Sequence, residues 1–395
     1  MSIDTQPQEI SPSQLNNSPA DSYRGFNLIY LSLLYGCGAF TLNLAPVILG
    51  SLMEHLELSK ANAGLIITLE IVSMGIASVF LANHLRRISL HRLLLWVLSG
   101  LICFNLLSAA IENLYALGVL RSLAGLCSGA LLAITLYLIA HSTDHVRLLG
   151  LALTGSLLSG SAFLAFTPTA VEQWQLPGLF VTAAFLPFVL LVLLSRFQLI
   201  KESTTGGDEV KENNLPRLTA VGYLFIAAVL AIHIAQGGYY SFIEVLGTEI
   251  ALEKTTIGFT LSLSYLLALT GSLTASAVGN RFGLTLPLLI GMVGQSTAVA
   301  TAVFTSDHNY FMAAVCLQSF FYFLFTPYLL GAANKIDPSG KLSAVGMGVI
   351  ITGLGFAPLI YGLILSHFSS LFIAWAMVSS AIFSFIALQI TLKSE

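Results

Sequence analysis

Residues 63–87 read AGLIITLEIVSMGIASVFLANHLRR, an apolar run that ends in two arginines. The part from 63 to 82 is long enough to cross a hydrocarbon layer of about 30 Å as a helix, at roughly 1.5 Å per residue. Cations gather at the cytoplasmic ends of such helices. The stretch therefore predicts a transmembrane helix that ends in the cytoplasm, with one acidic residue, Glu70, inside it.

Composition extends this prediction to the whole chain. Of the 395 residues, 56% are hydrophobic and only 9% are charged, whereas a soluble domain carries about 25% charged residues. The chain is therefore predicted to be an integral membrane protein whose main partner is the lipid bilayer. A net charge of −3 gives no sign of nucleic-acid binding. The four cysteines lie in apolar runs without a C-x-x-C pair, so no zinc or other metal site is expected.

Cutting the chain at its polar interruptions predicts an all-α fold of twelve transmembrane helices in two six-helix halves. Residues 1–25 are rich in Ser, Pro, Gln and Asn, and predict a disordered cytoplasmic tail rather than a signal peptide. The N-terminal half covers 26–195, a polar linker covers 196–218, and the C-terminal half covers 219–392. The predicted spans are 26–50, 63–82, 92–110, 115–140, 148–168, 178–195, 219–246, 257–278, 285–304, 309–332, 342–366 and 369–391.

The placement of Lys and Arg orients these spans. With the N-terminus inside, thirteen of the 16 cations fall on the cytoplasmic side. Only Lys60 and Lys254 fall outside, and Arg121 lies within a span. A missed span would invert every later assignment, so this asymmetry supports the helix count and places both termini in the cytoplasm.

Two short turns repeat between the halves. After the second span the chain reads Leu81-Ala-Asn-His-Leu-Arg-Arg87, and after the eighth it reads Val278-Gly-Asn-Arg-Phe-Gly283. With the six-plus-six topology, these turns resemble the major facilitator superfamily, whose signature here is G-x-x-x-D-R-x-G-R-R. Asparagine stands at the Asp position in both turns, so the amide can hydrogen-bond without a charge. The resemblance implies that the turns act in gating through Asn83, Arg86, Arg87, Gly279, Asn280, Arg281 and Gly283.

The fourth span carries a second resemblance. It reads Arg121-Ser-Leu-Ala-Gly125-Leu-Cys-Ser-Gly129, similar to the R-x-x-x-G-x-x-x-G pattern of this family. Glycines at this spacing permit close approach of helices. The resemblance implies a solute site near the middle of the membrane, lined by the first, fourth, seventh and tenth helices. On the first, fourth and tenth helices it suggests Tyr35, Asn43, Tyr137, Gln318 and Tyr322.

Charged residues inside spans are costly and usually face the interior of the bundle. Glu70 and Arg121 lie six to seven residues from the outer starts of their spans, roughly 10 Å deep at about 1.5 Å per residue. Their matching depth predicts an ion pair within the N-terminal half. One interpretation is that this pair responds to solute or proton binding, and the other is that it only holds helices together. Arg121 could instead attract a carboxylate-bearing or zwitterionic solute if Glu70 took up a proton.

The seventh span is the most polar one. His233, Gln236, Tyr240 and Glu244 follow at spacings of three and four residues, which puts them on one helix face. We expect this face to line the solute site, although a polar seam between helices fits the same pattern. Gly237 and Gly238 are expected to loosen the helix midway.

The function predicted from these features is secondary transport of a small organic solute by alternating access. A carboxylate in apolar surroundings takes up a proton more readily than one in water, so Glu70 and then Glu244 are the candidates for proton coupling. The alternatives are a polytopic membrane enzyme and a membrane sensor. No Walker or hydrolase motif supports catalysis, and no cofactor is indicated. A monomer in a bacterial inner membrane is expected.

Overall fold

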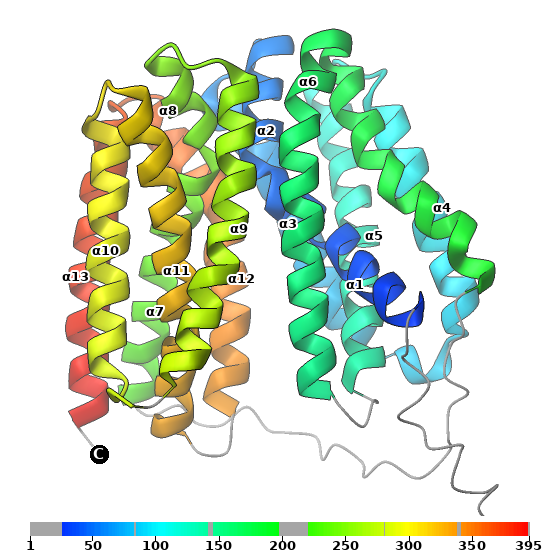
Figure 1. The fold of residues 1–395 in the computed structure, drawn as a ribbon. Helices are drawn as coiled ribbons and strands as arrows, with labels where there is room; N and C mark the ends of the chain where they lie inside the picture. The colour runs from blue at the N-terminus through cyan, green and yellow to red at the C-terminus, as the bar shows by residue number, and fades with distance from the viewer. Residues whose placement is uncertain are drawn as a thin grey trace, which may run out of the picture.

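The computed structural model describes residues 26–82, 84–140, 145–196, 220–279, 281–337 and 341–393. Helices account for nearly all of them, and no strand occurs in these ranges. The predicted tail, 1–25, and all of the predicted linker except Arg196 lie outside the described residues. The helices form two groups, α1 to α6 and α7 to α13, that stand side by side (Figure 1).

The N-terminal group is built from six helices. Their bounds are α1 Phe26–Gly38, α2 Phe40–His55, α3 Lys60–Ala82, α4 Leu90–Ser108, α5 Leu114–Ala140 and α6 His145–Leu193. The C-terminal group follows in the same manner. Its bounds are α7 Ala220–Ser241, α8 Ile243–Glu249, α9 Lys254–Val278, α10 Thr285–Phe304, α11 His308–Ile336, α12 Lys341–Leu365 and α13 Leu371–Lys393.

Twelve membrane crossings follow from these helices within the described part of the chain. Ten helices are long and apolar enough to span, and the α1–α2 pair, bent by 41°, adds an eleventh. The twelfth comes from α6, whose 49 residues include a non-helical turn at Gln175. Gly178 lies against the backbone of Ala170, whereas a straight helix would separate them by about 12 Å. The chain thus turns back at Gln175, and the predicted twelve-helix fold is confirmed.

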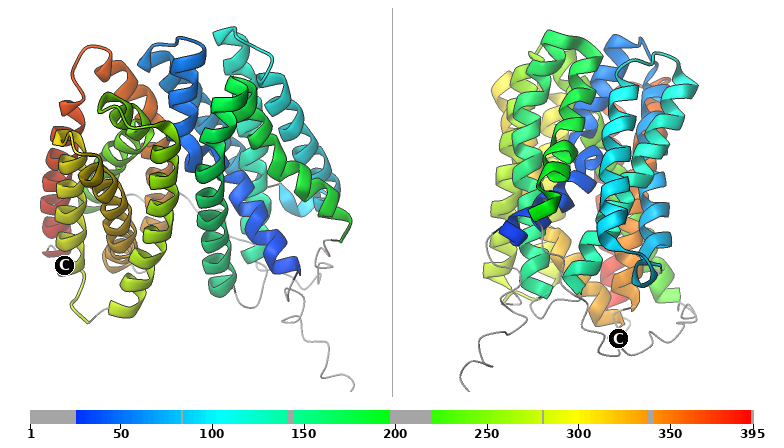
Figure 2. Two further views of the ribbon diagram at one scale, coloured as in Figure 1. Left: turned by 45° about the horizontal axis from the view of Figure 1, so that its top comes forward. Right: turned by 90° about the vertical axis from the view of Figure 1, so that its right-hand side faces the viewer.

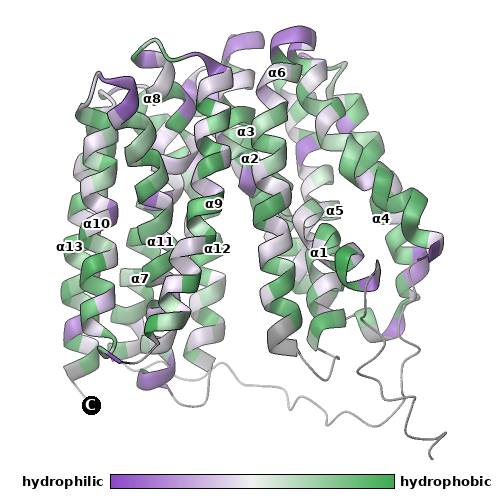
Figure 3. Ribbon diagram, in the orientation of Figure 1, coloured by the Kyte–Doolittle hydropathy of each residue, from purple (hydrophilic) through white to green (hydrophobic). Residues whose placement is uncertain are grey.

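The surface of the bundle is suited to lipid. Figure 3 shows hydrophobic residues along the helices and hydrophilic ones mainly near their ends. Large apolar side chains face outward from several helices, among them Trp96, Phe166 and Leu273, each at least 68% exposed. The protein is therefore an integral, multi-pass membrane protein.

The two halves touch mainly at one end of the bundle, the upper end in Figure 1. The helix pairs that pack across the boundary are α3 with α12 and α6 with α9, and α2 lies against α7 and α8. The contacting parts of α3 and α9 are their first halves, up to Ile71 on α3 and Tyr265 on α9, and these halves stand towards the upper end. Towards the lower end, where α13 finishes, the ribbons of the halves diverge, as Figure 2 also shows.

The expected loosening of the helix at Gly237–Gly238 does not occur, since α7 continues to Ser241 and is interrupted at Phe242 instead. The glycines serve a different purpose. A side chain on Gly237 would collide with α12 at Leu354 and Ala357, and one on Gly238 would collide with a ring on the same helix. They therefore let α12 pack closely on an unbroken α7.

Candidate coupling and solute site

Close packing of α3 and α5 positions the buried charges. A side chain at Gly125 would collide with the backbone oxygen of Glu70, and one at Gly129 would collide with that of Met74. Glycine at both places lets α5 lie directly on α3. Arg121, one turn before Gly125, then reaches the level of Glu70.

The predicted Glu70–Arg121 ion pair is present. An Nη1 of Arg121 lies 3.4 Å from Oε1 of Glu70, and each side chain is only 3% exposed. The other hydrogen bonds of Arg121 end on α4, at Ser108 Oγ, Asn105 Oδ1 and Phe104 O. Its guanidinium also stacks 4.8 Å from the ring centre of Phe180. Arg121 is thus enclosed within the N-terminal half, not directed towards the boundary between the halves.

Glu70 is only partly satisfied by its neighbours. Its Oε1 accepts hydrogen bonds from Arg121 and from Thr41 Oγ1, at 2.8 Å for the latter. Its Oε2 is buried and has no hydrogen-bond partner among the described residues. A buried carboxylate oxygen without a donor is costly while the group is charged. This arrangement suits a carboxyl group that gains and loses a proton.

Asn43, two residues after Thr41 on α2, joins the two halves. Its backbone oxygen accepts a hydrogen bond from Tyr240 on α7, and Tyr265 on α9 lies 3.3 Å from its Oδ1. Its amide donates to Ser156 on α6. The hydroxyls of Tyr240 and Tyr265 are 3.0 Å apart. Asn43 and Tyr240, predicted as solute contacts, therefore meet each other in a hydrogen-bonded layer that spans the boundary.

Three buried glutamines form a neutral cluster inside the C-terminal half. Oε1 of Gln236 accepts from Gln295 on α10 at 2.5 Å and from Gln318 on α11 at 2.6 Å. Gln236 and Gln318 are predicted site residues, whereas Gln295 was not predicted from the sequence. The feature that could have identified Gln295 is a single amide side chain inside the apolar ninth span. In the family that the sequence resembles, this helix does not line the centre.

His233 and Tyr322 lie next to this cluster, one turn away on α7 and α11. Their rings meet edge to face with centroids 5.9 Å apart. Nδ1 of His233 donates to the oxygen of Val229 at 2.7 Å, which leaves Nε2 as an acceptor. That atom is buried and has no hydrogen-bond partner among the described residues. Tyr322 is partly exposed.

Glu244 is not on α7 with His233 and Gln236, because it lies beyond Phe242, on the short helix α8. It is 4% exposed, and a side chain on Gly50 of α2 would collide with its carboxylate. Within the described ranges, this carboxylate has neither a hydrogen-bond nor an ion-pair partner.

Tyr35 and Tyr137, which were also predicted as site residues, are partly buried and pack against the core of the N-terminal half.

The repeated turns lie at the lower end. Gly279 and Gly283 have φ values of 52° and 67°, which glycine adopts at little cost. The hydroxyl of Tyr328 is 3.0 Å from the oxygen of Gly279 and ties α11 to this turn. Arg87 and Arg281 are exposed. Asn83, Asn280 and the side chain of Arg86 lie outside the described residues.

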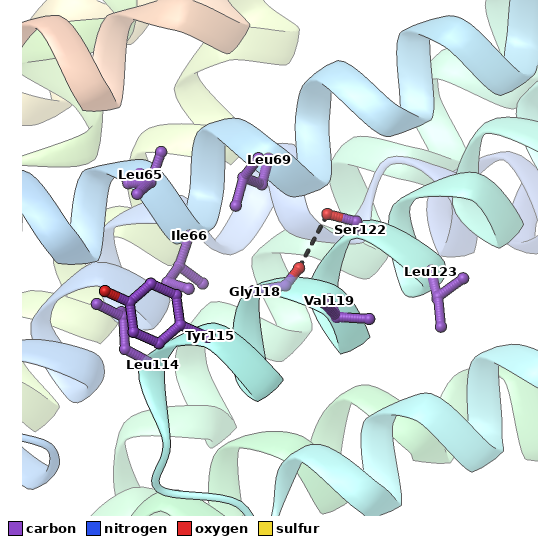
Figure 4. Close-up of a pocket in the computed structure, with 9 residues that line it drawn as sticks. All are labelled: Leu65, Ile66, Leu69, Leu114, Tyr115, Gly118, Val119, Ser122 and Leu123. Carbon is purple, nitrogen blue, oxygen red and sulfur yellow. Dashed lines mark hydrogen bonds between the residues drawn. The ribbon is translucent and has the colours of Figure 1, made fainter.

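A surface pocket between α3 and α5 is a poor candidate for the solute site. Its lining is apolar except for the hydroxyls of Tyr115 and Ser122, and that of Ser122 is already bonded to the oxygen of Gly118 (Figure 4). Tyr115 and Val119 on its rim are 82% and 61% exposed on the outside of the bundle. None of the predicted site residues lines it. In the part of the chain described, no group of His, Cys, Asp and Glu could hold a metal ion.

Comparisons with known proteins find a transporter superfamily and individual transporters. Residues 31–243 match the sequence model described as Major Facilitator Superfamily. A gallate transporter of Pseudomonas putida is 26% identical over 188 residues, which are 46% of this chain and 41% of that transporter. The match thus spans less than half of the curated relative.

Solved structures share the fold over almost the whole chain. A bacterial homolog of the human lysosomal transporter Spinster, inward-facing and occupied, superposes with a TM-score of 0.71 at 12% identity, covering 96% of this chain and 97% of that one. The xylose transporter XylE from E. coli, inward open, gives 0.69 at 12% identity, with 93% and 95% covered.

Proposed function

Because this chain belongs to the major facilitator superfamily, we propose that it is a proton-coupled secondary transporter of a small organic solute. The observation that carries the proposal is the position of α2. This one helix touches the buried acid through Thr41 and the opposite half through Asn43. A change in the charge of Glu70 can therefore act on the contacts between the halves.

The proposed orientation follows the cations. The lower end carries Arg87 and Arg281, so we place it in the cytoplasm, with both termini, in a bacterial inner membrane. The contacts at the upper end then close the outer side, and the conformation is inward-facing. Alternating access consists of exchanging these contacts for contacts at the lower end.

Proton coupling is assigned to Glu70. When Glu70 is charged, it holds both Arg121 and Thr41 through one oxygen. A proton on Glu70 removes the charge that attracts these two donors, which weakens the hold on α2. The hydrogen-bonded layer at Asn43 can then separate and open the outer side. Glu244, buried between α8 and Gly50, is the second site where a proton could bind and leave.

The solute is placed between the halves, near Asn43, Tyr240, His233 and Tyr322. These residues offer neutral hydrogen-bonding groups and aromatic edges, while Arg121 is occupied by its own partners. The gallate transporter named above handles a ring that carries hydroxyls and a carboxylate. Small hydroxylated aromatic acids are therefore the first solute class to test. Family membership favours this function over a membrane enzyme or a sensor.

The test is uptake into proteoliposomes with an imposed pH gradient, using labelled gallate and a panel of related acids. Replacing Glu70 with glutamine should lower gradient-driven uptake at least tenfold while exchange of solute between the two sides continues. Glu172→Gln changes an exposed acid of the same half and should leave gradient-driven uptake and solute exchange unchanged. Undiminished gradient-driven uptake by Glu70→Gln would remove Glu70 from the coupling, and transport of no member of the panel would remove the solute class.

A further inference from the structure

Four charged residues at the upper end occupy matching places in the two halves. Glu54 lies near the end of α2 and Lys60 begins α3, while Glu249 ends α8 and Lys254 begins α9. Each half thus contributes one carboxylate and one ammonium group to this set of four, around the connection between its first two crossings, where Glu57 and Glu253 also lie. Lys60 and Lys254 are the two cations that the sequence places on the outer side.

The ion pairs cross from one half to the other. Lys254 pairs with Glu54, and Nζ of Lys60 lies 3.7 Å from Oε1 of Glu249. Each lysine has a carboxylate of its own half only five or six residues away in sequence, yet it contacts the carboxylate of the opposite half. Both pairs can therefore form only when the halves meet at this end.

The surroundings hold one carboxylate in place. The hydroxyl of Ser370, just before α13, lies 2.8 and 2.7 Å from the two oxygens of Glu249. Glu54 has the ring of His55 beside it, with Nε2 3.6 Å from its Oε2. Directly below, the backbone of Lys60 packs against Gly362 of α12. The pair formed by Lys60 therefore sits on a close-packed seam between the halves.

We propose that the Glu54–Lys254 and Lys60–Glu249 pairs form a crossed latch that holds the upper end closed and breaks each time it opens. Only the breaking of the latch during a transport cycle rests on the proposed function. The closed state itself is present in the structure.

The exposure of the four side chains sets the strength of the latch. The lysines are 24% and 25% exposed and the carboxylates 50% and 44%, so water and salt screen the attraction. Each exposed pair then shifts the balance between closed and open by about two- to fivefold. A latch of that strength biases the equilibrium without preventing the motion.

Hydrogen exchange of the full-length protein in detergent, without solute, tests the latch. Glu54→Lys and Lys254→Glu each place like charges across the boundary, so exchange at the first turns of α3 and α9 should rise several-fold. The combined Glu54→Lys/Lys254→Glu variant restores opposite charges and should return exchange to within twofold of the wild type. Glu112→Lys reverses an exposed charge between α4 and α5, away from the latch, and should have no effect at these turns.

The outcome is independent of transport, since no solute is needed. If the single variants match Glu112→Lys, or if the combined variant stays as open as the single variants, the latch is refuted. Salt gives a second measurement that does not require charge reversal. Raising it to about 1 M should increase exchange at these turns in the wild type, and Glu54→Gln/Glu249→Gln should no longer respond. Equal responses in the two proteins would also refute the latch.

Discussion

At the scale of single residues, Arg121 shows how a charge survives in the bundle. Its planar guanidinium reaches Glu70 on α3 and three acceptors on α4, and it stacks on Phe180. A lysine could not reproduce this fork of donors. The residue therefore both neutralises Glu70 and ties three helices together.

The first prediction concerns this pair. Arg121→Met leaves Glu70 buried without its cation, which should cost about 3–5 kcal/mol of stability. The double variant Glu70→Gln/Arg121→Met removes both charges and should recover at least half of that loss. Thermal unfolding in detergent measures both. A single variant as stable as the wild type would mean that water reaches Glu70.

Matching depth in the sequence was enough to predict that Glu70 meets Arg121, because both spans start at the same membrane surface. The glutamine cluster was harder to predict. Gln236, Gln295 and Gln318 come from three helices whose rotation about their axes depends on the packing of the whole half. A single uncharged amide in an apolar span gives no indication of which neighbour it faces.

At the scale of elements, α2 contacts three different partners along its length. Thr41 meets Glu70, Asn43 meets Tyr240, and Gly50 lies against the acid of α8. The bend of 41° before it separates α2 from α1. One short helix thus links the buried acid of α3, the boundary between the halves and the acid of α8.

The second element-scale feature, the glycine contact of α5 with α3, gives a prediction. Gly125→Ala drives a methyl group into the backbone at Glu70, so α5 must move away. Overpacking of this kind costs about 1–3 kcal/mol, and it should also weaken the ion pair. Gly75→Ala on α3 meets nothing within 4 Å and should be neutral or slightly stabilising.

Unfolding temperatures and gradient-driven uptake of the two glycine variants provide the check. Equal behaviour of Gly125→Ala and Gly75→Ala would mean that α5 does not depend on this close contact.

Close packing at glycine also explains why the expectation for Gly237 and Gly238 was wrong. A glycine pair in a polar span suggests a loosened helix, but α12 occupies the space that the missing side chains leave. Only the folded structure shows whether such a pair loosens its helix or lets a neighbouring helix pack closely.

At the scale of the whole molecule, the halves have the same order of helices but different interiors. The N-terminal half encloses a charged pair, and the C-terminal half encloses neutral amides. The helix count followed from apolar length, and the placement of the cations gives the orientation that we propose. The crossed latch could not be predicted, because its partners lie 189 and 200 residues apart and meet only after both halves have folded.

The last prediction concerns the seam between α3 and α12. A side chain at Gly64 would collide with the backbone oxygen of Pro358, so Gly64→Ala should keep the upper end from closing. Hydrogen exchange along the second half of α12 should rise several-fold. Gly348→Ala on α12 meets nothing within 4 Å and serves as the control. Unchanged exchange in Gly64→Ala would place the seam elsewhere.

The crossed latch also has an electrical consequence. Each half supplies one Glu and one Lys to it, so its parting carries no net charge through the membrane field. One elementary charge crossing that field is worth about 2.3 kcal/mol per 100 mV. The movement of the latch is therefore electrically silent. In the proposed transport cycle, voltage would then act through the proton on Glu70 and the charge of the solute itself.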